Sequence, residues 1–128
     1  MTFKTINSIL AEKFPELSEA IKKEENFWKH EEVPPYCLYG PVVEPFIAKL
    51  LTEETNTSLI KRFFDFFEEM ANCDDIEVRN LVTVSVLESL WGNFTLLSIA
   101  HKYMHPQTRK LCDGLQVYFH PYVPPELQ

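Results

Sequence analysis

NTSLIKRFFDFFEEMANCDDIEVRNLVTVSVLESLW, residues 56–91, is the stretch that decides the fold of this chain. In its first half, residues 56–72, apolar side chains recur at spacings of three and four. This spacing predicts an amphipathic helix, because 3.6 residues per turn bring such positions onto one face. The apolar stripe is wide and consists of Leu59, Ile60, Phe63, Phe64, Phe66, Phe67, Met70 and Ala71.

The second half of the stretch is also predicted to be a helix, ending at Trp91. Residues 72–75 break the apolar pattern, and Asp74 or Asp75 can cap a new helix that carries Glu77 in its first turn. The β-branched run at 82–86 would also suit a strand, but it lies in an uninterrupted segment of about 16 residues, longer than a usual strand. We therefore expect a helix that is apolar nearly all round and covered on two or more sides.

Length and charge set the class of the protein. The 128 residues, 45% of them hydrophobic, fit a single domain over residues 1–128 with a real core. The formal net charge is -7, and residues 41–80 carry nine acids against four bases. The electrostatic field of this negative charge repels nucleic acid and anionic membranes and attracts a basic protein. We expect a protein partner, with no nucleic acid and no membrane.

Cysteine usage and the first residues indicate a cytoplasmic protein. Cys37, Cys73 and Cys112 are odd in number, widely spaced and free of any CxxC pair, which favours reduced thiols over a disulfide framework. Charged residues interrupt the apolar pattern of residues 1–14, so no signal-peptide core is expected there. No run reaches the roughly 18 apolar residues of a membrane span.

The remaining segments are also predicted to be mainly helical. Helices are expected over residues 2–14, 16–28, 43–53, 94–104 and 106–118. The Pro-rich segment 29–45 is predicted to be a long ordered loop or a short extended segment, and the Pro-rich tail 120–128 to be irregular. The expected fold is all-α, with about six to seven helices. Two architectures remain open: an irregular helical bundle, or a short HEAT-like α-solenoid suggested by the phrase DDIEVRNLVTVSVLESL.

The chain shows no catalytic signature. With three glycines it contains no GxGxxG, Walker or GxSxG motif, so we expect neither an enzyme nor a cofactor. His101 and His105 stand four apart and could share a metal ion. The candidate third ligand, Asp113, falls on another predicted helix, and there is no HExxH motif. A metal site is therefore not expected. A metal-dependent enzyme that uses these histidines ranks third among the possible functions, after the two protein-binding functions described below.

Two groups of residues are candidates for binding a partner. The first is an acidic set around the turn between the two central helices: Asp65, Glu68, Glu69, Asp74, Asp75 and Glu77. These acids either cap helices and face solvent, or form an acidic protein-binding face. The second group is Tyr36 and Tyr39 in the Pro-rich segment, which either contact a partner or pin that segment to the core.

The phrase FFDFFEEMANCDDIEVRNLVTVSVLESLWGN resembles a family of small acidic bacterial proteins linked to immunity against polymorphic and contact-dependent toxins. The resemblance covers residues 59–112, including KYM and a proline at 102–106, and leaves out the first 30 residues and the tail. It implies an all-helical immunity protein that neutralises a cognate toxin domain by direct binding. A toxin that cuts nucleic acids carries a basic substrate groove, which an acidic partner can occupy.

A second function remains open beside this one. The HEAT-like phrase would also suit a helical adaptor or regulatory scaffold that binds an endogenous protein. The 13% aromatic content leaves room for an apolar self-interface, so a homodimer is a further expectation to test.

Overall fold

The structure of the chain is a computed structural model that describes residues 1–29 and 31–119. Within those residues it contains helices and no strand, which confirms the all-α prediction. The elements in chain order are α1 (Ile6–Lys13), η1 (Pro15–Leu17), α2 (Ser18–Trp28), α3 (Pro35–Leu38), η2 (Tyr39–Val43), α4 (Glu44–Glu53), α5 (Thr57–Ala71), α6 (Ile76–Val82), η3 (Thr83–Leu87), α7 (Glu88–Leu90), α8 (Phe94–His101), α9 (Pro106–Asp113) and α10 (Gln116–Phe119).

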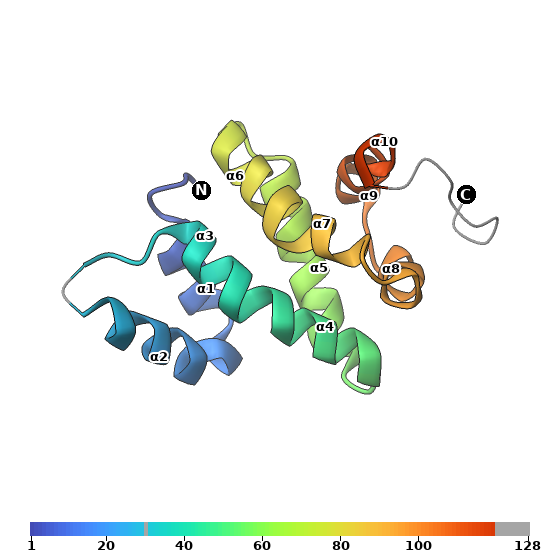
Figure 1. Cartoon of the computed structure of the whole chain (residues 1–128). Coiled ribbons are helices and arrows are strands. Elements are labelled where there is room, and N and C mark those ends of the chain that lie inside the picture. Colours follow the sequence, from blue (N-terminus) through green and yellow to red (C-terminus); the bar gives the residue numbers. More distant parts are fainter. Residues whose placement is uncertain (30, 120–128) are drawn as a thin grey trace.

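Three elements form the centre of the bundle: the long helix made of α3, η2 and α4, the long helix made of α6, η3 and α7, and helix α5 (Figure 1). The segments α3, η2 and α4 run on without a break, as do α6, η3 and α7, and the two long helices touch where η2 meets η3. Helix α5 packs against α4, α6 and α9. Helices α1 and α2 lie on one side of this centre, and α8, α9 and α10 on the other (Figure 1).

The apolar residues of α5 are the middle of the core, as the sequence pattern predicts. All eight residues of its apolar stripe are buried. The Phe63 ring stacks on Phe14, which follows α1, with centroids 3.9 Å apart and planes at 7°. Phe64 meets Tyr103, with the two ring centroids 6.1 Å apart, on the opposite side of the molecule. Burial of aromatic rings on several faces of one helix requires neighbours on several sides, and this produces the bundle.

Side-chain caps begin three of the helices in the described part of the chain. The Asn56 side chain accepts a hydrogen bond from the Leu59 N–H at the start of α5. Of the two aspartates considered for α6, Asp75 is the cap and accepts from the Glu77 N–H. Asn93 caps α8 in the same way through the Leu96 N–H. Each cap satisfies a backbone donor that the helix itself cannot pair.

The prediction of a non-helical segment is wrong over residues 35–42, where the chain is already helical, and this helix continues through the one predicted from residue 43. Pro35 stands in the first turn, where the missing N–H costs no hydrogen bond. The turn at 39–43 widens to a π-helix, in which the Glu44 N–H bonds the Tyr39 carbonyl. A widened turn accommodates Pro41 and Pro45, neither of which can donate to the helical ladder.

The remaining boundaries agree with the sequence to within a few residues. Among the described residues, the irregular part of the Pro-rich segment is confined to 29 and 31–34, and the predicted tail at 120–128 lies outside the described residues. Gly114 separates α9 from α10, at the weak point that its low helix propensity indicates. None of the helices in the described ranges has the length and hydropathy needed to cross a membrane.

Replacing Phe63 with alanine tests the central role of α5. Phe63 is fully buried against Phe14 and Phe46, so Phe63→Ala should lower the free energy of unfolding by about 3–5 kcal/mol. Phe27 is 77% exposed, and Phe27→Ala should change it by less than about 0.5 kcal/mol. Urea denaturation followed by far-ultraviolet circular dichroism measures both values. Equal losses in the two variants would contradict the assigned core.

Candidate partner-binding surface

The structure gives different roles to the six acids predicted to bind a partner. Glu68 is only half-buried and faces α9, not solvent alone. Its carboxylate accepts hydrogen bonds from the Gln107 N–H at 3.1 Å and the Thr108 N–H at 2.8 Å. It also accepts from the Thr108 hydroxyl at 2.9 Å and from Asn72 Nδ2 at 3.0 Å. Glu68 therefore caps the N-terminus of α9 although it is 40 positions away from Thr108 in the sequence.

The environment of Glu68 favours its charged form. Burial by itself raises the pKa of this carboxyl, but the hydrogen bonds from Thr108, Gln107 and Asn72 outweigh it, and the pKa lies below the ordinary 4.5. The positive end of the α9 dipole favours the same charge state. Glu68 thus holds α9 against α5 in place of a side-chain cap from His105, which makes none.

Asp75 is also used within the fold. One carboxylate oxygen caps α6, and the other accepts a hydrogen bond from the Phe3 N–H at 2.9 Å. Cys73 adds a second link to the same segment, with its Sγ 3.2 Å from the carbonyl oxygen of Met1. Asp75 therefore attaches the first residues of the chain to the turn between α5 and α6.

Asp65 and Glu69 are exposed, and each contacts a basic side chain: Glu69 forms an ion pair, and Asp65 contacts a histidine that is charged only when protonated. Asp65 Oδ1 lies 2.7 Å from His105 Nε2, and a carboxylate oxygen of Glu69 lies 3.3 Å from Lys13 Nζ. Pairs of this exposure contribute only about 0–1 kcal/mol each to stability. Both carboxylates remain accessible, but a basic side chain of the protein already sits beside each.

The prediction that Tyr39 contacts a partner is wrong. Its side chain is completely buried, and its hydroxyl donates to the carbonyl oxygen of Ile6 at 3.3 Å. Burial raises the pKa of this phenol well above its ordinary value of 10. Because residues 35–53 form a helix and not a loop, Tyr39 turns inward, and it pins the helix to α1 as the alternative interpretation states.

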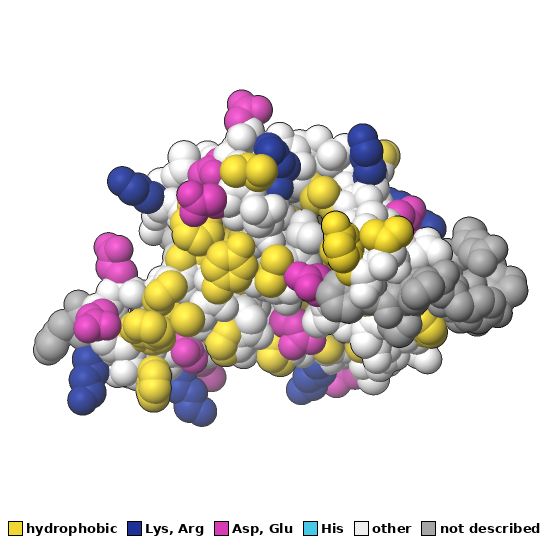
Figure 2. All heavy atoms as spheres, turned by 45° about the horizontal axis from the view of Figure 1, so that its top comes forward, with side chains coloured by type: hydrophobic (Ala, Val, Ile, Leu, Met, Phe, Trp, Pro, Cys, Tyr) yellow, Lys and Arg dark blue, Asp and Glu magenta, His cyan; other side chains and the backbone are white. Residues whose placement is uncertain are grey.

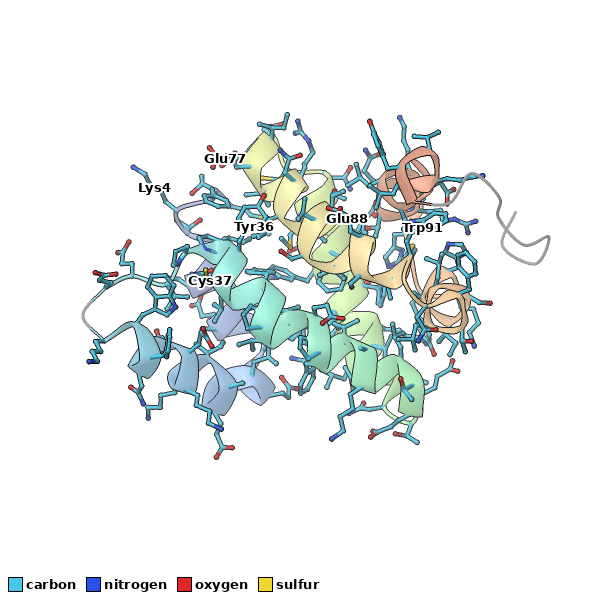
Figure 3. All side chains as sticks on the ribbon, viewed as in Figure 1. Lys4, Tyr36, Cys37, Glu77, Glu88 and Trp91 are labelled. Carbon is cyan, nitrogen blue, oxygen red and sulfur yellow. The ribbon has the colours of Figure 1, made fainter. Side chains whose placement is uncertain are left out.

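Tyr36 lies on the surface and is 41% exposed. Its ring centroid is 6.0 Å from that of Phe3, with the planes at 49°. Partial burial raises the pKa of the Tyr36 phenol, and the carboxylates of Glu77 and Glu88 raise it further. Figure 3 shows Tyr36 between Glu77 and Glu88 in the view, with one acid toward each end of the helix formed by α6, η3 and α7.

Three carboxylates on this side have no cationic partner among the described residues. In residues 1–29 and 31–119 no ion pair involves Asp74, Glu77 or Glu88. Asp74 and Glu77 are exposed, and Glu88 is half-buried. Lys4 is labelled on the same side in Figure 3, yet it forms no ion pair with them. Negative charge is therefore uncompensated in this part of the described surface.

Exposed apolar residues accompany these acids. Val84 is 49% exposed and Ile76 59% exposed. Figure 2, which brings this side of the molecule forward, shows hydrophobic side chains gathered among acidic ones. The sequence analysis did not predict Glu88 and Val84 as partner-binding residues. Their spacing from Glu77 could have indicated that they share its helix face. Positions 77, 84 and 88 follow one another at seven and four residues, which places them on one helix face.

Tyr36, Asp74, Glu77, Val84 and Glu88 together are called the acidic aromatic patch below. An exposed aromatic ring supplies contact area, and unpaired carboxylates supply charge for a cationic group. The patch holds three of the eight residues predicted from sequence: Tyr36, Asp74 and Glu77. The other five are paired, used in the fold or buried.

His105, His101 and Cys112 differ in their surroundings. His105 pairs with Asp65, and His101 is half-buried with an Nε2 that has no hydrogen-bond partner among the described residues. Burial lowers the pKa of His101, with Arg109 acting in the same direction. Burial also raises the pKa of the Cys112 thiol to about 12, which removes thiolate reactivity. Across the described residues, no three His, Cys, Asp or Glu side chains are grouped to hold a metal ion.

One protein family matches most of the chain. It is described as "Domain of unknown function (DUF7674)", and the match spans residues 7–120. No curated protein and no solved structure matches the chain. The comparisons therefore assign the chain to a family without naming an activity or a partner.

Replacing Glu68 with glutamine tests its role as the cap of α9. The amide would keep the shape but offer one acceptor oxygen to the N–H and O–H donors of Gln107, Thr108 and Asn72. Glu68→Gln should therefore lower the free energy of unfolding at pH 7 by about 2 kcal/mol. A lowered pKa in the folded state means that the charge stabilises above pH 4.5 and that this stabilisation is lost as pH falls through the folded-state pKa. The difference from the parent protein should shrink toward acid pH.

A neighbouring substitution serves as the control for Glu68. Glu69 is exposed and paired with Lys13 alone among the described residues, so Glu69→Gln should cost less than about 1 kcal/mol. Urea unfolding at a series of pH values measures both variants. A loss for Glu68→Gln that did not depend on pH would contradict a role for its charge.

Proposed function

We propose that this chain, which belongs to the DUF7674 family, is an immunity-type protein that neutralises a cognate bacterial toxin by direct binding through an acidic surface. It acts in the cytoplasm as a binding protein, without a cofactor and without enzymatic activity of its own. The proposal joins the resemblance of residues 59–112 to immunity proteins with the physical character of the acidic aromatic patch.

The observation that supports this function best is the uncompensated charge of the patch. Among the described residues, the carboxylates of Asp74, Glu77 and Glu88 form no ion pair. A surface carboxylate that is merely solvated needs no aromatic neighbour, whereas a partner-binding site combines charge with apolar anchors. Tyr36 and Val84 supply those anchors here.

The net charge of the whole chain favours the same kind of partner. A formal charge of -7 on 128 residues attracts a basic protein over several ångströms and repels nucleic acid. A toxin domain that cleaves nucleic acid is basic around its substrate groove, so an acidic inhibitor gains association rate by electrostatic steering. The proposed partner is therefore a basic toxin domain, of which a nuclease is the natural example.

The face proposed here is smaller than the one expected from sequence. Glu68 and Asp75 are used as caps, Asp65 and Glu69 already have partners, and Tyr39 is buried. The face proposed for the toxin is centred on Tyr36, Glu77 and Glu88. Binding there would leave the contacts of α5 with α9 undisturbed.

Co-expression with the product of the gene immediately upstream tests the function. If that product is the toxin, its C-terminal domain should stop growth when expressed alone, and the chain should restore growth and co-purify with it. Purification with an endogenous housekeeping protein, and no effect on any neighbouring gene product, would favour the helical adaptor instead and overturn the proposal.

Charge reversal tests the face separately from the function. The triple variant Asp74→Lys, Glu77→Lys, Glu88→Lys should lose growth protection and weaken toxin binding by about a hundredfold or more. The matched control has the same net charge and reverses three exposed acids that form no ion pair among the described residues: Glu12→Lys, Glu19→Lys and Glu53→Lys. Protection lost only in the control would show that the toxin binds another face.

A further inference from the structure

The positions of Tyr36, Glu77 and Glu88 in the acidic aromatic patch indicate which chemical groups of a partner can bind there. Tyr36 comes from α3, and Glu77, Val84 and Glu88 come from the facing long helix of α6, η3 and α7. The carboxylates of Glu77 and Glu88 are both near enough to the Tyr36 phenol to disfavour its ionisation. Negative charge therefore reaches the ring from two directions (Figure 3).

An aromatic ring flanked by carboxylates is suited to a cation. The face of the ring carries a negative electrostatic potential, which attracts an ammonium or guanidinium group. The nearby carboxylates strengthen this attraction and can accept its hydrogen bonds. Within the described chain no Lys or Arg fills this role, since no cation lies over Tyr36 and no ion pair involves Glu77 or Glu88.

The helix beside Tyr36 leaves room for an incoming side chain. Gly40 is one turn further along the same helix, four positions after Tyr36. A Cβ built at Gly40 would meet no atom within 4 Å, so the space over this turn is open. A bulky side chain of a partner can thus approach the backbone next to the Tyr36 ring.

We infer that the acidic aromatic patch is the docking site for a basic helical segment of a partner protein, with one cationic side chain opposite Glu77, a second opposite Glu88, one of the two lying against the Tyr36 ring, and an apolar side chain over Val84. The inference rests on the proposed function and narrows it, because it states which part of a toxin the chain would recognise. It applies equally to any protein partner that carries such a segment.

The spacing of the acids sets the spacing of the cations. Glu77 and Glu88 are eleven positions apart, or roughly 16 Å along the helix axis. A partner helix alongside would match this distance with basic residues eleven positions apart. Arginine fits better than lysine, because its planar guanidinium both stacks on an aromatic ring and forms paired hydrogen bonds with a carboxylate.

Competing occupants fit the patch less well. Nucleic acid and anionic lipid present phosphates, which the unpaired carboxylates repel. A second copy of the chain would bring the same acids face to face in a symmetric dimer, placing like charges opposite each other. A basic protein segment is the occupant whose charge complements the patch.

A peptide titration followed by nuclear magnetic resonance tests the inference on the full chain. The probe is a blocked, alanine-based helical peptide with two arginines eleven positions apart and a leucine seven positions after the first. Backbone amide shifts should be confined to the surroundings of Tyr36, Gly40 and Val84. A matched peptide with glutamates in place of the arginines should cause no shifts there.

Variants then separate the parts of the site. Glu77→Gln with Glu88→Gln should weaken binding of the arginine peptide by about tenfold, as loss of two surface charge pairs predicts. The control pair, Glu12→Gln with Glu19→Gln, should bind like the parent protein. Tyr36→Phe keeps the ring and should bind normally, whereas Tyr36→Ala should weaken binding about threefold or more.

The outcomes distinguish this inference from the proposed function. Shifts elsewhere on the surface, or equal effects of the two glutamate pairs, would overturn the docking site even if a toxin co-purifies. Peptide binding at the patch with no effect of its variants on any toxin would support the site while refuting its use in immunity. Dimerisation of the free chain that the Tyr36→Ala variant abolishes, measured by light scattering, would replace the basic segment by a second copy.

Discussion

Burial of the aromatic residues of α5 is the constraint on which the rest of the structure depends. Its apolar side chains project over much of its circumference, so a single neighbouring helix could not cover them. Phe63 stacks on Phe14 from the N-terminal helices, while Phe64 meets Tyr103 from the C-terminal part. Helices distant in sequence are thus collected around one element.

Polar contacts fix the position of helices that the apolar core alone would leave free to slide. Glu68 caps α9, Asp75 holds the first residues of the chain, and Arg62 donates hydrogen bonds to Glu16 and to the carbonyl oxygen of Lys13. Each such contact is directional and joins residues at least 39 positions apart. The acidic residues of positions 41–80 therefore have two different roles. Some hold the fold together, and the remainder stay on the surface.

The two widened turns at η2 and η3 connect the core to the candidate surface. They lie in the middle of the two long helices, where these helices touch. The η2 turn keeps the chain helical through Pro41 and Pro45, and so carries Tyr36 on a helix in place of a loop. A side chain on a packed helix is held more rigidly than one on a loop, which lowers the entropic cost of binding. The fold in this way presents Tyr36 next to the acids of the neighbouring helix.

The sequence by itself determined the all-α class, the two central helices, their caps and the apolar stripe of α5, because helix periodicity and capping are local properties. It could not determine that Glu68 binds the α9 backbone or that Tyr39 points inward, since each depends on a neighbour that only packing brings close. The helical start at Pro35 was not predicted, because several prolines close together argue against a helix. A π turn accommodates them, and its hydrogen-bond pattern cannot be read from the sequence. Tertiary contacts also decide which carboxylates have a partner within the fold. Glu68 and Asp65 have one and were removed from the candidate site, whereas Glu88 forms no ion pair in the described chain and was added to it, beside Tyr36.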